Sequence, residues 1–307
     1  MANFDLDRDS VQETDTKTDI IQEEETTVSD TTETNTKKKK VNDVRITITD
    51  DRTPIVILFG PPACGKTMTL IRLSHYLNKA GYSITPDRDF RPSNDHDYEH
   101  MCDKFENDLN NDTAADPTNN MNFMLVTVHR RVRNICQILE AAGELYFNPD
   151  EPKKEEPLYL EQIKQAKNRK IWVIFLEPEW KDKNIRKAYV DRIKGLYGTT
   201  IATTDRVIFL GNKADKAVKY ITNQIIDADK YKEHLSFKTD GGLYPGVFEI
   251  FKEEHFFKRI FKPYKCDFLP FSTGSYVKGN NTQVVEGGDV YPKKLWNMIL
   301  KHAGKKW

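Results

Sequence analysis

The sequence predicts an α/β sandwich of three layers, in which a mostly parallel β-sheet with one antiparallel hairpin strand is covered by helices on both faces. Short apolar runs typical of buried strands recur along the chain, and they alternate with segments whose apolar residues have helical spacing. One pair of runs, residues 122–129 and 134–139, is separated only by the basic turn at residues 130–133, as in an antiparallel hairpin. The chain past residue 50 is long enough for one such domain with its own core.

The first expected strand, residues 55–59, runs into the glycine-rich loop GPPACGKT at residues 60–67, and an amphipathic helix follows. This order predicts a phosphate-binding loop, because a strand and a helix confirm the G-x-x-x-x-G-K-T pattern. Backbone N–H groups of the loop would surround the β-phosphate, Lys66 would reach the β and γ oxygens, and the Thr67 hydroxyl would coordinate Mg²⁺. The prediction is a P-loop NTPase fold whose nucleotide-binding loop residues are Gly60, Cys64, Gly65, Lys66, Thr67 and Met68.

A second strand-like run, residues 206–211, ends in the sequence Asn212-Lys213-Ala214-Asp215. The Asp215 carboxylate can accept hydrogen bonds from both the ring N1–H and the exocyclic amine of guanine, whereas adenine lacks that N1–H donor. Lys213 can lay its methylene stem along the base, and Asn212 can brace the phosphate loop by hydrogen bonds. Because open α/β sheets bind ligands at the carboxyl ends of their strands, this motif predicts a guanine nucleotide, GTP or GDP.

The second hairpin strand ends in the sequence Glu-Ala-Ala-Gly-Glu at residues 140–144. The order of phosphate loop, hairpin, this turn and the N-K-A-D motif resembles a Ras-like small GTPase domain of the translation-factor-related class, as a divergent member of bacterial type. That family has Asp-Thr-Ala-Gly-Gln-Glu at the turn. The resemblance implies that Glu140 holds Mg²⁺ through a water, that the Gly143 N–H touches the γ-phosphate, and that Glu144 stands where the family places its water-orienting Gln.

The last predicted strand, residues 267–271, leads into Ser272-Thr273-Gly274, which resembles the family's fifth motif. The resemblance implies that the backbone N–H of Thr273 meets the guanine O6; an ordinary turn has the same residues. The other elements predicted from the apolar pattern are a strand at 171–176 and helices at 184–196, 217–226 and 292–302, the last ending at Gly304.

Two insertions, residues 82–121 and 229–264, extend this minimal domain. The first contains Tyr98, Cys102, Phe105 and Leu109 at helical spacing, which predicts an extra helix. It also contains Asp-Pro-Thr at residues 116–118, which resembles a switch motif of Ras-like proteins and makes Thr118 our candidate Mg²⁺ ligand. Thr113 and Thr85 are alternatives, and so is a polar turn with an incidental Thr.

The second insertion is the most aromatic part of the chain, and lysine and arginine residues alternate with its rings. Such a pattern can bind single-stranded nucleic acid, but we favour packing of the rings onto the sheet, because burial of aromatic residues needs no partner. A surface for docking another protein is an intermediate hypothesis. The aromatic residues are Phe248, Phe251, Phe256, Phe257, Phe261 and Tyr264.

The formal net charge of zero conceals an uneven distribution. Residues 1–36 are rich in Asp, Glu and Thr, and Lys37 to Lys40 follow. We expect residues 1–45 to be a disordered, solvated tail and residues 46–307 to be the GTPase-like domain. The chain shows no signal peptide and no apolar run long enough to cross a bilayer, and Cys64, Cys102, Cys136 and Cys266 are scattered, so we expect a cytoplasmic protein with reduced thiols.

The leading hypothesis is a GTP-binding molecular switch with slow, Mg²⁺-dependent hydrolysis, in which Lys66, Gly143 and Glu144 act on the γ-phosphate and its attacking water. We expect a protein partner or regulator, disfavour nucleic acid, and leave peripheral membrane contact open. One alternative is a P-loop ATPase or kinase, which would use Glu177 and Glu179 as its acidic strand end. A pseudo-GTPase scaffold that binds GTP without turnover is the other alternative.

Overall fold

The computed structural model describes residues 44–110, 123–141, 143–148, 157–180, 182–216, 221–222, 225–236, 242–261, 264–277, 283–286 and 288–304. The predicted acidic tail lies outside these residues, apart from its last two positions. In the described chain, seven strands form one sheet with the order β2-β3-β4-β1-β5-β6-β9. Only β3 runs antiparallel to its neighbours, as predicted for the hairpin. The strands are β1 Ile55–Phe59, β2 Ser83–Pro86, β3 Phe123–Arg130, β4 Arg133–Ala141, β5 Lys170–Leu176, β6 Arg206–Gly211 and β9 Cys266–Pro270.

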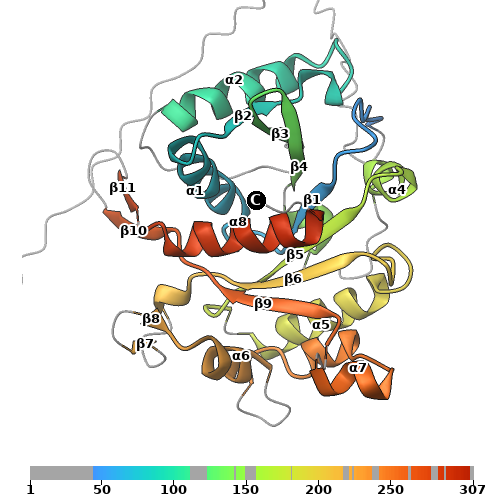
Figure 1. The fold of residues 1–307 in the computed structure, drawn as a ribbon, viewed down its shortest axis with the longest axis vertical. Helices are drawn as coiled ribbons and strands as arrows, with labels where there is room; N and C mark the ends of the chain where they lie inside the picture. The colour runs from blue at the N-terminus through green and yellow to red at the C-terminus, as the bar shows by residue number, and fades with distance from the viewer. Residues whose placement is uncertain are drawn as a thin grey trace, which may run out of the picture. The chain divides into compact units, whose positions relative to one another are not determined.

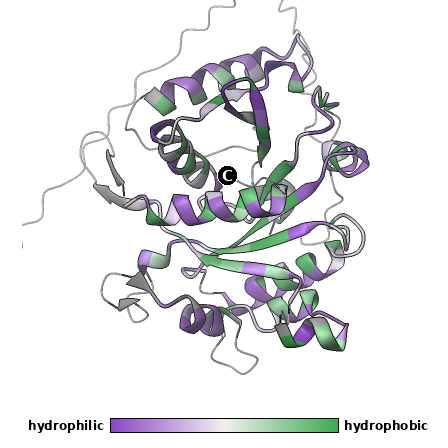
Figure 2. Cartoon of the chain, viewed as in Figure 1, coloured by the Kyte–Doolittle hydropathy of each residue, from purple (hydrophilic) through white to green (hydrophobic). Residues whose placement is uncertain are grey.

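Helices cover both faces of the sheet and complete the three layers (Figure 1). The central strand β1 is buried along its whole length. Figure 2 shows β6 and β9 as hydrophobic over most of their length, whereas α8 Val290–Ala303 alternates between polar and apolar residues. Asp182 caps α5 by accepting hydrogen bonds from the backbone N–H groups of Asn184 and Ile185, and Gly304 ends α8 with a φ of 70°. The helices α1 Lys66–Lys79 and α8 Val290–Ala303 lie on one face, and α5 Lys183–Leu196 and α6 Ala228–Ser236 lie on the other.

The first insertion has secondary structure of its own. Its predicted extra helix is confirmed as α2 His96–Asn110, on which Tyr98, Cys102 and Phe105 are buried. The edge strand β2 and the short helix η2 Arg88–Phe90 were not predicted, since four residues with alternating exposure give a weak pattern. Thr113 and Thr118 lie outside the described residues.

The predicted helix at residues 217–226 is wrong in the part that the structure describes. Residues Ile221–Thr222 (β7) pair antiparallel with Ile225–Ile226 (β8), and the next helix, α6, begins only at Ala228. All four paired residues are β-branched, which favours the extended conformation over the helix. A second two-stranded ribbon, β10 Gly274–Val277 with β11 Gln283–Glu286, precedes α8.

The aromatic insertion divides into a packed and an exposed part. Phe248 and Phe251 lie in η5 Val247–Phe251 and pack edge-to-face on Phe209 of β6, which confirms the packing hypothesis for these two rings. Phe256 and Phe257 are 63% and 78% exposed on α7 Phe256–Phe261, so the packing hypothesis is wrong for them. No helix of the described chain combines the length and apolar character needed to cross a membrane.

Candidate nucleotide-binding site

The loop between β1 and α1 depends on both glycines of its motif. A Cβ at Gly60 would lie 2.6 Å from Sγ of Cys64 and 2.8 Å from Cβ of Phe175. Gly65 has a φ of 90°, and a Cβ there would lie 2.4 Å from Nδ2 of Asn212. Only residues without a side chain fit these two positions, so the backbone can curve tightly between the strand and the helix.

Lys66 begins α1 and turns its side chain back into the loop. Its Nζ donates hydrogen bonds to the carbonyl oxygens of Gly60 at 3.2 Å and Pro61 at 3.1 Å, and the residue is 5% exposed. No carboxylate of the described chain lies within ion-pair distance of Nζ. A buried cation that contacts only neutral groups is well suited to bind an anion, since an anion would replace its missing counter-charge.

Cys64 is an inert part of this loop. Its side chain is fully buried, and burial raises the pKa of its thiol to about 11, although the Lys66 charge acts in the opposite direction. The thiol is therefore protonated at neutral pH. All four cysteines, Cys64 among them, are buried thiols that form no disulfide.

Thr67 and Glu140 meet at the carboxyl ends of two adjacent parallel strands. Glu140 pairs with Leu58 in the β1–β4 register, and its Oε1 accepts a hydrogen bond from Thr67 Oγ1 at 3.0 Å. One hydroxyl and one carboxylate are oxygen ligands of the kind that Mg²⁺ uses when substrate phosphates and waters complete its shell. The described part of the chain holds no group of three or more His, Cys, Asp or Glu that could bind a metal ion.

Gly143, at the start of α3 Gly143–Tyr146, lies directly against the phosphate loop. A Cβ at this position would fall 2.1 Å from the Pro62 nitrogen and 2.3 Å from the Pro61 carbonyl carbon. The structure thus brings the predicted γ-phosphate contact to the loop and shows why glycine is needed there. The side chain of Glu144 lies outside the described part of the chain, so its role remains a prediction.

Thr85 is wrong as a candidate Mg²⁺ ligand. It pairs with Thr127 of β3, Thr127 pairs with Gln137 of β4, and Gln137 pairs with Ile55, the first residue of β1. Thr85 therefore lies level with the end of the sheet opposite the phosphate loop, three strands away from β1. Its hydroxyl is instead within hydrogen-bond distance of the His129 ring, with 2.9 Å between Oγ1 and Nε2.

The two predicted base-recognition motifs touch each other. Since β6 and β9 are parallel neighbours, the turns that follow them lie side by side, and Ala214 N donates to the Phe271 carbonyl oxygen at 3.0 Å. Asp215 Oδ1 accepts a hydrogen bond from Ser272 Oγ at 2.7 Å, while Oδ2 accepts none from the described chain. Thr273, next to Ser272, is 8% exposed. An exposed carboxylate oriented by Ser272 can accept hydrogen bonds from a base edge.

Asn212 joins this base-recognition turn to the phosphate loop. Its side chain is 2% exposed, and Nδ2 donates to the Cys64 carbonyl oxygen at 2.7 Å. This contact confirms the predicted brace between the two motifs.

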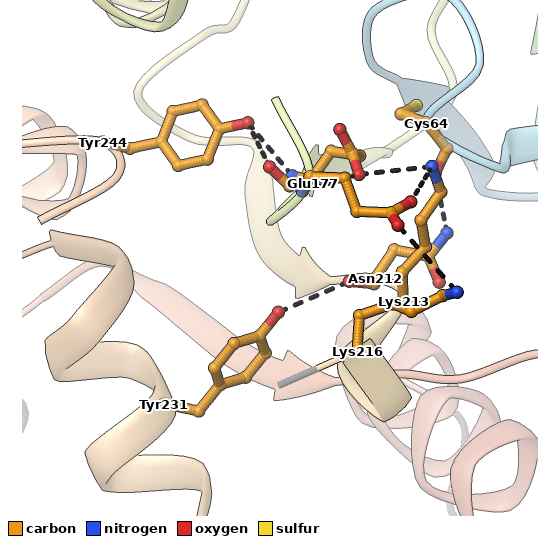
Figure 3. A network of polar contacts seen from close by, with 8 residues as sticks. Cys64, Glu177, Asn212, Lys213, Lys216, Tyr231 and Tyr244 are labelled. Atoms are coloured by element: carbon orange, nitrogen blue, oxygen red, sulfur yellow. Dashed lines mark hydrogen bonds and ion pairs between the residues drawn. The ribbon is translucent and has the colours of Figure 1, made fainter. Parts of the chain in front are cut away.

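Lys213 forms ion pairs with Glu177 and Glu179, the two acidic residues that the ATPase alternative requires as its acidic strand end. Its Nζ lies 3.2 Å from Glu177 Oε1 and 3.1 Å from Glu179 Oε2 (Figure 3). Burial lowers the pKa of Lys213, but the charges and hydrogen bonds of both glutamates outweigh it and raise the pKa above its ordinary value. Glu179 also faces Lys216. The acidic pair of the ATPase alternative thus binds lysines of the base turn, and the acid that contacts Thr67 is Glu140.

The glycine-rich loop between β1 and α1, with the other described motifs at the carboxyl ends of a mostly parallel sheet, defines a P-loop NTPase fold. No protein-family model matches the chain, and no curated protein matches its sequence.

The solved structures that are similar to the chain at a low level include two GTP-binding or GTPase-like proteins. One is a protein described as nucleolar GTP-binding protein 1 from Plasmodium falciparum, with 12% identity and a TM-score of 0.39 over 85% of this chain and 90% of that chain. The other is the GTPase-like domain of Ski7 from S. cerevisiae, bound to GTP, with 13% identity and a TM-score of 0.37 over 83% of this chain. The match spans 51% of the Ski7 chain, and similarity of this size assigns no function.

Proposed function

We propose that this chain binds GTP and GDP with Mg²⁺ and hydrolyses GTP slowly, as a molecular switch. The observation that carries the proposal is the hydrogen bond from Asn212 Nδ2 to the Cys64 carbonyl oxygen, which joins the base-recognition turn to the phosphate loop across 148 residues of sequence. A single ligand with a guanine base and phosphates can therefore engage Asp215 at one end and Lys66 at the other.

The chain's own groups account for binding. Lys66 and the loop N–H groups would hold the phosphates, and Gly143 would add a backbone donor. Thr67 and Glu140 would hold the metal ion, which would supply positive charge to stabilise the anionic phosphates. The motif resemblance implies that Glu144 replaces a neutral water-orienting Gln, and a negative charge there would oppose attack on an anionic phosphate, which supports slow turnover.

We extend the proposal to the location of the protein in the cell and to its partners. We place the protein in the cytoplasm with a protein partner or regulator, and the exposed rings of Phe256 and Phe257 on α7 support such a partner.

The test is the nucleotide that the purified protein retains, together with its turnover. We expect GDP or GTP to be released on denaturation, GTP and GDP to displace each other, ATP to compete poorly, and chelation of Mg²⁺ to abolish turnover. Retention of ATP, or preference for it, would contradict the proposal. Tight GTP binding with no turnover would leave a non-hydrolysing scaffold in place of the switch.

A further inference from the structure

Two buried tyrosines of the second insertion contact the chain around the base site: one binds the base-recognition turn itself, and the other binds the neighbouring loop that follows β5. Tyr231, on α6, donates a hydrogen bond to the Asn212 carbonyl oxygen at 3.4 Å. Tyr244 donates to the carbonyl oxygen of Glu177 at 2.8 Å and accepts a hydrogen bond from the Glu177 N–H at 3.2 Å. Both tyrosines are fully buried, and burial raises the pKa of Tyr244, so its hydroxyl stays protonated and can donate. Figure 3 shows both rings approaching the turn from the insertion.

Glu177 is fixed at both its backbone and its side chain. Because one hydroxyl binds its N–H and its carbonyl oxygen, the backbone of Glu177 cannot rotate without breaking both contacts with Tyr244. Its side chain is 8% exposed and reaches Lys213. A buried carboxylate in this position must keep its cationic partner, because an unpaired buried charge is costly.

Lys213 needs such a partner to keep its conformation. Its φ is 50°, in the left-handed region that residues other than glycine rarely adopt. The backbone strain must be offset by surrounding contacts, which include the hydrogen bond from the Lys216 N–H to the Lys213 carbonyl oxygen at 2.9 Å and the ion pair with the buried Glu177. Glu179, the second partner, is 48% exposed and therefore a weaker anchor.

We propose that Glu177 and Tyr244 are positioning residues for the guanine base: Tyr244 holds Glu177, and Glu177 holds Lys213 so that its methylene stem forms a fixed surface for the base. The inference rests on the proposed function. It assigns the second insertion a role in base binding, although none of its residues belongs to a guanine motif.

The experiment compares two ligands, GDP and inorganic tripolyphosphate, which offers phosphates but no base. Affinities are measured by calorimetry for the parent, Glu177→Gln and Tyr244→Phe. Tyr264→Phe is the matched control, since its hydroxyl binds Glu249 within the same insertion and away from the turn. We expect GDP affinity to fall about tenfold in Glu177→Gln and about three- to tenfold in Tyr244→Phe, while tripolyphosphate affinity stays within about twofold. Tyr264→Phe should match the parent with both ligands.

Equal losses for GDP and tripolyphosphate would show general damage to the domain and overturn the positioning role. Unchanged GDP affinity in both variants would overturn it as well. A parent protein that binds tripolyphosphate but no guanine nucleotide would refute the proposed function itself, which separates that failure from the failure of this inference.

Discussion

Asn212 and Cys64 are joined by a 2.7 Å hydrogen bond from the Asn212 amide to the Cys64 carbonyl oxygen, which connects the base-recognition turn directly to the phosphate loop. Replacing Asn212 with Ala leaves the buried Cys64 carbonyl oxygen without this donor. We expect the free energy of unfolding to fall by about 1–3 kcal/mol, as measured by urea denaturation. GDP affinity should fall with it. A variant as stable as the parent would show that the hydrogen bond does not join the two motifs.

Lys66 provides the charge that the phosphates need. In Lys66→Ala, the affinity for GTP should fall by several kcal/mol, on the order of a charge-assisted hydrogen bond plus its lost electrostatic attraction, because the buried ammonium has no substitute. The measurement is a competition titration with GTP. Lys187→Ala is the matched control, since Lys187 pairs with Asp191 on the exposed side of α5. GTP affinity equal to the parent's in Lys66→Ala would contradict the account of the loop.

Glu144 is predicted to act in the hydrolysis of GTP and not in its binding. If it orients water, Glu144→Ala should change single-turnover hydrolysis much more than GTP affinity, because it acts on the transition state. Equal changes in both quantities would indicate a structural role.

Asp50, which lies just before β1, makes the free energy of unfolding depend on pH in the acidic range. Burial raises the pKa of its carboxyl, but hydrogen bonds from Thr53, Asn134 and backbone N–H groups outweigh it and lower the pKa from 3.8 to about 2. Because the folded-state pKa lies below the unfolded one, the stabilisation is present above pH 3.8 and is lost as the pH falls toward 2.

Urea denaturation at pH 7, 4 and 3 tests this dependence. The parent should be more stable than Asp50→Asn at neutral pH, and the difference should shrink on acidification. Asp51→Asn, at the exposed neighbouring position, is the matched control. A constant difference between the parent and Asp50→Asn at all three pH values would refute the assignment to Asp50.

The strands and the loop could be predicted because their signals are local. Residues 55–59 and 207–210 are continuous apolar runs, the first between Pro54 and Gly60 and the second between Arg206 and Gly211, and β1 and β6 lie at these runs. The helix predicted at 217–226 is wrong because the β-branched residues Ile221 and Ile225 favour the extended conformation, which their apolar character alone does not reveal.

Tertiary contacts could not be predicted in the same way. The ion pair between Glu177 and Lys213 depends on the neighbouring positions of β5 and β6, whereas the sequence alone offers Glu177 only as the acidic strand end of the ATPase or kinase alternative. Composition could not distinguish the buried Phe248 from the exposed Phe256 in one aromatic segment.

The central claim, guanine recognition by Asp215, is tested most directly by exchanging its hydrogen-bonding pattern. Asp215→Asn keeps the size of the side chain but replaces an acceptor with an NH₂ donor, which would face the exocyclic amine of guanine. Xanthine has a carbonyl oxygen at that position and would match the new donor. In direct competition, Asp215→Asn should bind GTP more weakly by about 1–3 kcal/mol or more and xanthosine triphosphate more tightly than the parent does, with ATP poor for both proteins. An unchanged ratio of GTP to ATP affinity, or a parent that prefers ATP, would contradict the account.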